Sequence, residues 1–372
     1  MFEKTKALCD SFLGMGVPGF DLIVYKDGQQ ILRHMGGYSD KEKKLPMKGT
    51  EKVNIYSCSK PITVTAAMQL WEKGLFALED KLSDYMPEFA HMTVRTEGGI
   101  VPAQNPIRIH HLFEMTAGFS YDVRSPRLVK LREETGGVCP TREVARALAA
   151  EPLHFEPGTQ YRYSLCHDVL AALVEVLSGQ PFDDYVRTHI FAPLGMHDST
   201  FLLPPERYEE VAAHYVFKAD EGKAVERSKF PSYRIGTEHA SGGAGCVSTL
   251  ADYIKFAEAL RTGETLLKRS TIRLMTTDRL TEEQRTTFTM KLYGYGLGMR
   301  APLEGCSRRD YGWGGAAGAY LAVDEEHGIS LFYVQHMLSS PNQSLRGSIY
   351  TCVLEDLGIA ATHTVTNNNL TY

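Results

Sequence analysis

Hydrophobic residues gather in short β-type runs near the two ends of this chain. FDLIVY (20–25) and QILRH (30–34) lie on either side of an Asp-Gly turn, and AYLAV (319–323) and ISLFYVQ (329–335) flank the sequence DEEHG. β-Branched and aromatic runs around such turns are typical of β-hairpins. The two hairpins therefore predict one antiparallel sheet that is built from both chain termini.

Between these ends, hydrophobic positions follow the helical period. In residues 61–73, Ile62, Ala66 and Leu70 recur on one face, and Gly74 follows as a stop signal. A sheet from the termini with a helical middle predicts an α/β fold, in which helices flank the sheet and a mainly helical domain is inserted. Further helices are predicted over residues 141–150, 168–179 and 249–263.

The chain length suggests more than one domain. At 372 residues, the chain exceeds the size at which a single hydrophobic core usually stops growing. We expect residues 1–80 and 245–372 to form the α/β domain and residues 81–244 to form the mainly helical domain. The active site is then expected at the interface between the two.

Composition and charge exclude several classes of protein. Hydrophobic residues make up 43% of the chain and charged residues 23%, which is ordinary for a globular protein. The net charge of −5 is too mild to attract nucleic acid or an anionic membrane. Charges scattered through the first 20 residues argue against a signal peptide, and seven cysteines without a C-x-x-C pair indicate free thiols. We expect a cytoplasmic protein without nucleic-acid or membrane partners, and the sequence leaves its oligomeric state open.

The sequence IYSCSKPIT (55–63) contains a candidate nucleophile, Ser57, three residues before Lys60. Positions three apart share a helix face, so the amine of Lys60 can reach the hydroxyl of Ser57, whereas Cys58 points elsewhere. A helix N-terminus also favours a developing oxyanion. The plain alternative is that Ser57 or Ser59 only caps the helix, and this motif alone does not choose between the two.

Two further motifs carry residues of catalytic type. Tyr163, in YRYSLCHDV, is either a buried residue with a satisfied hydroxyl or a source of phenolate if a nearby ammonium lowers its pKa. Trp313-Gly314-Gly315 runs directly into a strand. Glycines there let the backbone approach a ligand and leave an N–H free to donate, although a strand-edge bulge is the alternative.

Several other polar residues are better explained by packing. No His or Asn arrangement points to Cys58 as a nucleophile, and His167 is expected at a helix N-terminus or behind the site, because no G-x-S-x-G elbow accompanies it. His110 and His111 are adjacent, and no H-E-x-x-H is present. We therefore expect neither a metal nor a cofactor.

In this order, the three motifs resemble the active-site set of the penicillin-recognising serine hydrolases, in which S-x-x-K is followed by S-D-N and K-T-G elements. The chain is most similar to the class C β-lactamase-like group, which includes the family VIII carboxylesterases. The resemblance spans nearly the whole chain and includes EKGLFALEDKLSDYMPEF, FEPGTQYRYSLCHDVLAALVEVLSG and GWGGAAGAYLAVDEEHG.

The resemblance implies a role for each motif. Ser57 would be the acylated nucleophile, and Lys60 and Tyr163 would transfer its proton, with the choice of base left open. The N–H groups of Ser57 and Ala316 would form the oxyanion hole. Either an amine or a phenol that lies within reach of the Ser57 hydroxyl could act as the general base that activates this serine.

Two positions depart from the pattern of the β-lactamases. Leu165 stands where these enzymes usually carry the Asn of Y-x-N, and Trp313 replaces the Lys of K-T-G. Losing a polar clamp and a cation while gaining an aromatic wall favours neutral, apolar acyl groups. We expect Tyr121, Leu165 and Trp313 to contact the substrate, together with Gly314 and Gly315.

The function expected from the sequence is a serine carboxylesterase that cleaves small neutral or apolar esters. The first alternative keeps the fold and changes the bond to an amide, as in a β-lactamase, a D-aminopeptidase or a D,D-peptidase. The second alternative is a non-catalytic relative that only binds a ligand. In each case the partner is a small molecule.

Overall fold

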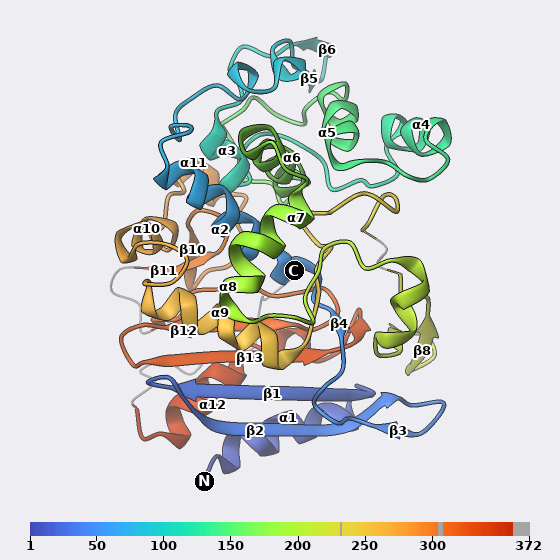
Figure 1. Ribbon diagram of the computed structural model, residues 1–372, viewed down its shortest axis with the longest axis vertical. Helices are drawn as coiled ribbons and strands as arrows, with labels where there is room; N and C mark the ends of the chain where they lie inside the picture. The colour runs from blue at the N-terminus through green and yellow to red at the C-terminus, as the bar shows by residue number, and fades with distance from the viewer. Residues whose placement is uncertain (231–232, 304–307, 360–372) are drawn as a thin grey trace.

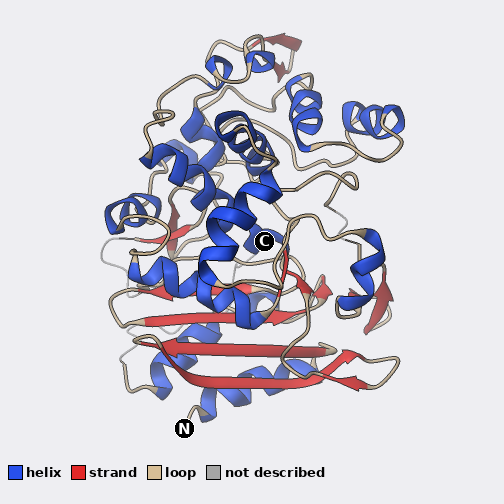
Figure 2. Ribbon diagram, viewed as in Figure 1, coloured by secondary structure: helices blue, strands red, loops and turns tan. Residues whose placement is uncertain are grey.

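The computed structural model describes residues 1–230, 233–303 and 308–359. Its long strands lie together at one end of the molecule, and most helices lie at the other (Figures 1 and 2). The cysteines of the described residues are all free, and five of these six are buried. The seventh cysteine, Cys306, lies outside the described residues.

The main sheet joins the two ends of the chain. Its strand order is β12-β13-β1-β2-β3, and every neighbouring pair is antiparallel. Strand β1 (Gly19–Lys26) lies between β2 (Gln29–Asp40) and β13 (Ile329–Gln335), and β12 (Tyr320–Asp324) pairs with β13. The predicted sheet from both termini, with its two hairpins, is confirmed.

Helices cover both faces of this sheet. Leu22 packs in a cluster with α1 (Glu3–Gly14) and α12 (Ser348–Asp356), whereas Ile23 belongs to the larger core on the opposite face, which includes α9 (Leu250–Thr262). Figure 1 shows α9 on one side of the sheet and α1 and α12 on the other. Strands buried on both faces are apolar without alternation, which explains the continuous runs in β1 and β13.

Two predicted helices form the centre of the helical region. Helix α2 (Ser59–Glu72) is buried on nearly every side and packs against α6 (Cys166–Ser178), which ends at Gly179 in the left-handed conformation. Helix α5 (Thr141–Ala149) packs on α6 in turn. These helices, and α9 with its N-cap at Thr249, confirm the four predicted helices to within two residues at each end.

The remaining elements are short. A small sheet pairs β7 (His214–Lys218) with β8 (Lys223–Arg227) and, in parallel, with β14 (Met337–Leu338), so a strand from residues 81–244 pairs with one near the C-terminus. The division into two domains stays a prediction.

The other helices are α3 (Ile109–Phe113), α4 (Pro126–Glu134), α7 (Phe182–Val186), α8 (Ala192–Leu194), α10 (Arg269–Met275) and α11 (Glu282–Arg285), and the other strands are β3 (Leu45–Pro46), β4 (Val53–Asn54), β5 (Thr93–Thr96), β6 (Gly99–Pro102), β9 (Val247–Ser248), β10 (Tyr293–Tyr295) and β11 (Arg300–Pro302).

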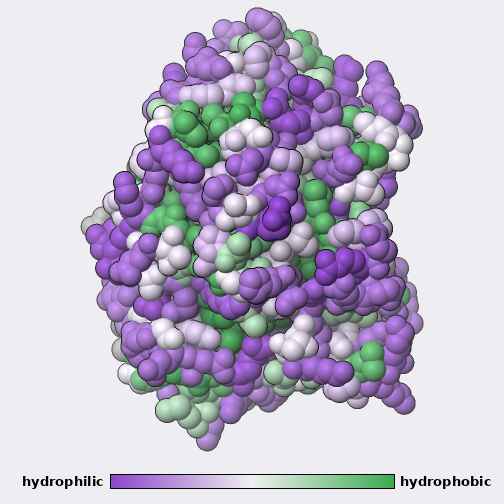
Figure 3. Space-filling view, in the orientation of Figure 1, coloured by the Kyte–Doolittle hydropathy of each residue, from purple (hydrophilic) through white to green (hydrophobic). Residues whose placement is uncertain are grey.

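The surface is mainly hydrophilic on the face drawn in Figure 3, where hydrophobic residues form small separate patches. The largest cluster of hydrophobic side chains is buried, and it extends from the main sheet into the helices around α2 and α6. Within the described ranges, none of the helices has the length and apolar character that crossing a membrane requires.

Candidate active site

Ser57 lies in a short 3₁₀ turn, η1 (Tyr56–Cys58), that leads directly into α2. Tyr56 has a φ of 48°, a left-handed conformation that is costly for a residue with a side chain. The Tyr56 ring is held by His214, whose ring stacks on it and whose Nε2 is 3.2 Å from the Tyr56 hydroxyl. The strained turn is therefore fixed by packing, and it leaves Ser57 8% exposed at the start of the helix.

The structure brings Lys60, in the first turn of α2, close to Ser57 in the turn that precedes this helix. The Lys60 side chain is fully buried, and its Nζ lies 3.4 Å from Ser57 Oγ. The same amine donates to the Gly243 carbonyl at 2.7 Å and lies 3.4 Å from the Tyr121 hydroxyl. The spacing of three residues predicted this approach, whereas nothing local in the sequence predicted the contacts with Gly243 and Tyr121.

Because the Lys60 side chain is buried, its ammonium group can lose its proton near neutral pH. Burial lowers the pKa of Lys60 to about 7, and the negative charge of Asp168 opposes part of this effect. Burial also disfavours the Asp168 carboxylate, yet hydrogen bonds from His239 and Ser241 hold its pKa below the usual value. The Ser241 hydroxyl donates to Asp168 at 2.6 Å, and His239 Nε2 lies 3.2 Å from the same oxygen.

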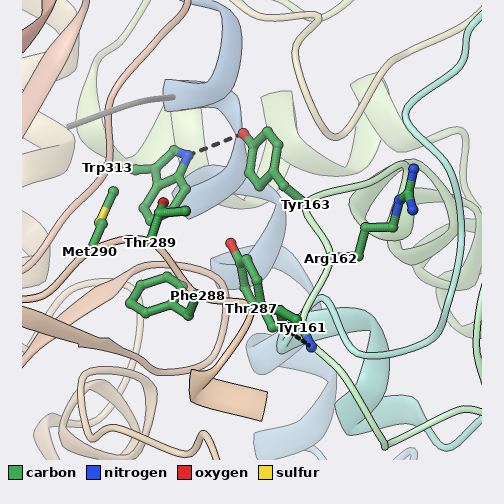
Figure 4. A pocket seen from close by; sticks show the side chains of 8 residues that line it. All are labelled: Tyr161, Arg162, Tyr163, Thr287, Phe288, Thr289, Met290 and Trp313. Carbon is green, nitrogen blue, oxygen red and sulfur yellow. Dashed lines mark hydrogen bonds between the residues drawn. The ribbon is translucent and has the colours of Figure 1, made fainter. Parts of the chain in front are cut away.

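Tyr163 lies against the other side of the amine. Lys60 Nζ is 4.5 Å from the centre of the Tyr163 ring, and the Tyr163 hydroxyl accepts a hydrogen bond from Trp313 Nε1 at 3.2 Å (Figure 4). Burial raises the pKa of Tyr163 above its usual value, although hydrogen bonds with Ser57 and Trp313 oppose the increase. This direction is the reverse of the one that a phenolate base requires, so the phenol is protonated at neutral pH.

Tyr121 has a place in the same cluster that the sequence did not reveal. Its ring stacks on Tyr163 with centroids 5.3 Å apart and planes 8° apart, and Tyr233 packs edge-on against it at 5.4 Å. Burial raises the pKa of Tyr121 well above its usual value, and a hydrogen bond with Ser57 opposes this. Tyr121 was expected only as a wall of the pocket, but its hydroxyl also faces the amine of Lys60.

The glycines after Trp313 bring a backbone turn close to Ser57. A side chain at Gly315 would collide with the carbonyl oxygen of Ile55, so only glycine lets this turn pack on the residues before Ser57. Ala316, the next residue, is half-buried. Among the residues that the structure describes, none accepts a hydrogen bond from the Ala316 N–H. This N–H therefore has its donor capacity available for a ligand.

A cavity of about 230 Å³ opens beside Tyr163 and Trp313. Figure 4 shows Trp313, Phe288 and Met290 around the same space, whereas the Arg162 side chain points away from it. Apart from Tyr163 and Trp313, sequence reasoning missed this lining, because most of it comes from a segment without a recognisable motif. The cavity is lined by Tyr161, Arg162, Tyr163, Thr287, Phe288, Thr289, Met290 and Trp313.

Leu165, Cys58 and His167 are buried and do not line this cavity. Leu165 is 1% exposed and belongs to the hydrophobic core, so its side chain offers no polar group to a ligand. Burial raises the pKa of Cys58 to about 12 and lowers that of His167 to about 3. At neutral pH Cys58 is therefore a thiol and His167, which lies in the first turn of α6, is uncharged. Within the described part of the chain, no cluster of three His, Cys, Asp or Glu residues could hold a metal.

Comparisons with known proteins support the resemblance. The sequence matches the family model described as Beta-lactamase over residues 7–346. Esterase EstB of Burkholderia gladioli is 30% identical over 267 residues, which cover 64% of this chain and 64% of that protein. The structure of EstCE1, a hydrolase with promiscuous acyltransferase activity, is 25% identical with a TM-score of 0.78, and the match covers 94% of this chain and 97% of EstCE1.

A second solved structure bears on the fold alone. D-amino acid amidase from Ochrobactrum anthropi SV3 is 21% identical with a TM-score of 0.70, and the match covers 95% of this chain and 97% of the amidase. The solved structures confirm the α/β fold class expected from the sequence, and the family model and the esterase relative confirm the expected superfamily.

Proposed function

This chain belongs to the beta-lactamase family of serine hydrolases, and we propose that it is a carboxylesterase that works through an acyl-Ser57 intermediate. The observation that carries the proposal is the approach of a buried, weakly basic amine to a serine hydroxyl, with Lys60 Nζ 3.4 Å from Ser57 Oγ. A hydroxyl becomes a nucleophile when a base with a pKa near the working pH is within reach.

We assign the role of base to Lys60 and that of proton relay to Tyr163. The neutral amine takes the proton of Ser57 while Ser57 Oγ forms a bond with the ester carbonyl carbon. The carbon–oxygen bond to the alcohol then breaks, the leaving oxygen takes the proton of the Tyr163 phenol, and the Lys60 ammonium replaces that proton and becomes neutral again. The raised pKa of Tyr163 supports a relay, because a relay must hold its own proton between turnovers. Water then attacks the acyl carbon and loses a proton to Lys60, the bond from the acyl carbon to Ser57 Oγ breaks, and Ser57 recovers its proton as the acid leaves.

The oxyanion of the tetrahedral intermediate would be held by the N–H groups of Ser57 and Ala316. The close packing of Gly315 on Ile55 supports this assignment, because it brings the turn that carries Ala316 up to the Ser57 segment. Backbone donors fixed in advance stabilise the charge that develops in the transition state without reorganising during the reaction.

The walls of the site favour an apolar acyl group. The cavity beside Tyr163 is lined by Trp313, Phe288 and Met290, and Leu165 offers no amide to a substrate side chain. Arg308 and Arg309, two cations that could anchor the carboxylate of an anionic substrate, have other contacts. Arg308 is buried beside Tyr350, and Arg309 pairs with Glu326 at 3.1 Å. These features support neutral esters over anionic amides as substrates.

A panel of three substrates tests the proposal. The wild-type protein and the Ser57→Ala variant are assayed with a short-chain p-nitrophenyl ester, a D-amino-acid p-nitroanilide and a chromogenic cephalosporin. We expect Ser57-dependent turnover of the ester, with at most slow turnover of the other two. Rapid cephalosporin or anilide turnover with a silent ester would replace the carboxylesterase by the amide hydrolase. A serine-directed fluorophosphonate that leaves no adduct on Ser57 would favour a ligand-binding relative instead.

A further inference from the structure

A buried arginine contacts the turn that carries the proposed oxyanion donor. Arg346 follows the 3₁₀ turn η6 (Gln343–Leu345) and is 1% exposed, and its Nη1 donates to the Gly315 carbonyl at 3.0 Å. The Gly315 carbonyl and the Ala316 N–H belong to the same planar peptide group. Whatever fixes the direction of the carbonyl therefore also fixes the direction of the N–H, which points the opposite way.

Backbone hydrogen bonds fix the rest of this turn. The Gly315 carbonyl also accepts from the Gly318 N–H at 2.9 Å, and the Gly315 N–H donates to the Ala319 carbonyl at 2.7 Å. The Met337 N–H donates to the Ala317 carbonyl at 3.0 Å. These are bonds between neutral backbone groups, whereas the bond from Arg346 brings a full charge to the peptide that ends in the Ala316 N–H.

We propose that Arg346 is a positioning residue of the oxyanion hole, which orients the Gly315–Ala316 peptide and polarises its N–H. This inference rests on the proposed role of Ala316 in ester hydrolysis. A charged donor on a carbonyl makes the N–H of the same amide a stronger donor, because hydrogen bonds in a chain polarise one another. The guanidinium also adds positive charge behind the position where the oxyanion develops.

The direction of the pKa shift of Cys58 agrees with this place for the charge of Arg346. Burial raises the pKa of the Cys58 thiol, and the positive charges of Arg300, Arg346 and Lys60 each oppose the increase. Cys58 is the residue next to Ser57. The positive charge of Arg346, together with those of Arg300 and Lys60, therefore favours a negative charge beside Ser57, which is the direction that stabilisation of an oxyanion requires.

The alternative is that Arg346 only ties η6 to the turn. Two variants and a matched control separate these roles. Arg346→Met removes the charge and the donor at similar length, and Arg346→Lys keeps a charge and a donor without the planar fork. The control is Arg308→Met, because Arg308 is also a buried arginine, 7% exposed, whose Nη1 lies 3.4 Å from the carbonyl of Gly347, the residue after Arg346.

The main measurement is the second-order rate at which a fluorophosphonate labels Ser57, since this reaction also places negative charge on an oxygen in the hole. The melting temperature, and the kcat and KM for a p-nitrophenyl ester, are measured alongside. For Arg346→Met we expect labelling and kcat to fall about 10-fold with KM nearly unchanged, because removing a direct oxyanion donor costs about 100-fold or more. Arg346→Lys should recover part of the loss, and Arg308→Met should label at the wild-type rate.

The outcomes separate this inference from the proposed function. A wild-type protein that is not labelled at Ser57 would overturn both. Labelling of the wild-type protein with an unchanged rate in Arg346→Met would overturn the role of Arg346 alone, and so would an equal loss in Arg308→Met. If Arg346→Met does not fold, Arg346→Gln replaces it, with the same loss expected and the same wild-type rate counting against the inference.

Discussion

The amine of Lys60 lies over the face of the Tyr163 ring, 4.5 Å from its centre. An ammonium in this position is stabilised by the negative face of the ring, while the hydroxyl of the same ring remains available to Ser57 and Trp313. Ser57 is therefore within reach of two separate groups, the amine of Lys60 and the hydroxyl of Tyr163. One group is suited to take the proton of Ser57, and the other is suited to pass a proton to the leaving group.

Replacing the amine tests the first role. In Lys60→Met, kcat/KM for a p-nitrophenyl ester should fall about 1,000-fold, because general-base catalysis typically contributes 10²–10⁴. The melting temperature should stay level or rise, since a buried amine costs free energy that a thioether does not. Retained esterase activity in a folded Lys60→Met protein would remove Lys60 from the mechanism.

The pH dependence of kcat/KM tests the protonation state of Lys60. The base must be neutral, and burial lowers the pKa of Lys60 to about 7. Activity should therefore be low at pH 5, rise tenfold per pH unit while the amine is mostly protonated, and level off above about pH 8. Titration of kcat/KM against pH gives the midpoint, and a midpoint near 10 would show an amine that is not desolvated.

Asp168→Asn should move that midpoint in a known direction. The charge of Asp168 raises the pKa of Lys60 against the effect of burial, so its loss should shift the acidic limb of the profile to lower pH. Asp183→Asn is the matched control, because Asp183 is a half-buried carboxylate that accepts hydrogen bonds from Thr200 and the Leu202 backbone. A shift to higher pH, or an equal shift in both variants, would contradict the assignment.

Tyr163→Phe tests the relay with a series of leaving groups. If the phenol protonates the leaving oxygen, its loss should slow an ethyl ester about 100-fold and a p-nitrophenyl ester much less, because p-nitrophenolate departs without a proton. Tyr121→Phe is the comparison, since Tyr121 also faces Lys60 but should show no such dependence on the leaving group. Equal losses for both esters in Tyr163→Phe would argue that Tyr163 only packs against the amine.

The parts of the fold that could be predicted are those encoded by local patterns. The hairpin of β1 and β2 surrounds an Asp-Gly turn, and α9 begins at a Thr cap and ends at Gly263. Helix α1 was not predicted, although its buried positions Thr5, Cys9 and Phe12 follow the helical period, because two of these three residues are small and give a weak hydrophobic signal. Its position is determined by packing against α12, which lies at the other end of the chain.

The same limit applies to the candidate site. Ser57 and Lys60 are three residues apart, so helical geometry alone predicted their approach. Tyr163 and Ala316 were assigned roles only through the resemblance. The contacts of Lys60 with Tyr121, and of Arg346 with Gly315, join segments 61 and 31 residues apart. Such contacts arise from tertiary packing, and no spacing in the sequence encodes them.

The proposed place of the acyl group can be tested at Met290, which is 6% exposed and lines the cavity beside Trp313. In Met290→Phe the bulkier ring should exclude about two methylenes of a long acyl chain, at ~0.8 kcal/mol each. The ratio of kcat/KM for p-nitrophenyl octanoate to that for the acetate should therefore fall about 10-fold, while the acetate alone changes little. Met275→Leu, a substitution in the buried core away from the cavity lining, is the control for general effects on packing. An unchanged ratio in Met290→Phe would mean that the acyl chain lies elsewhere.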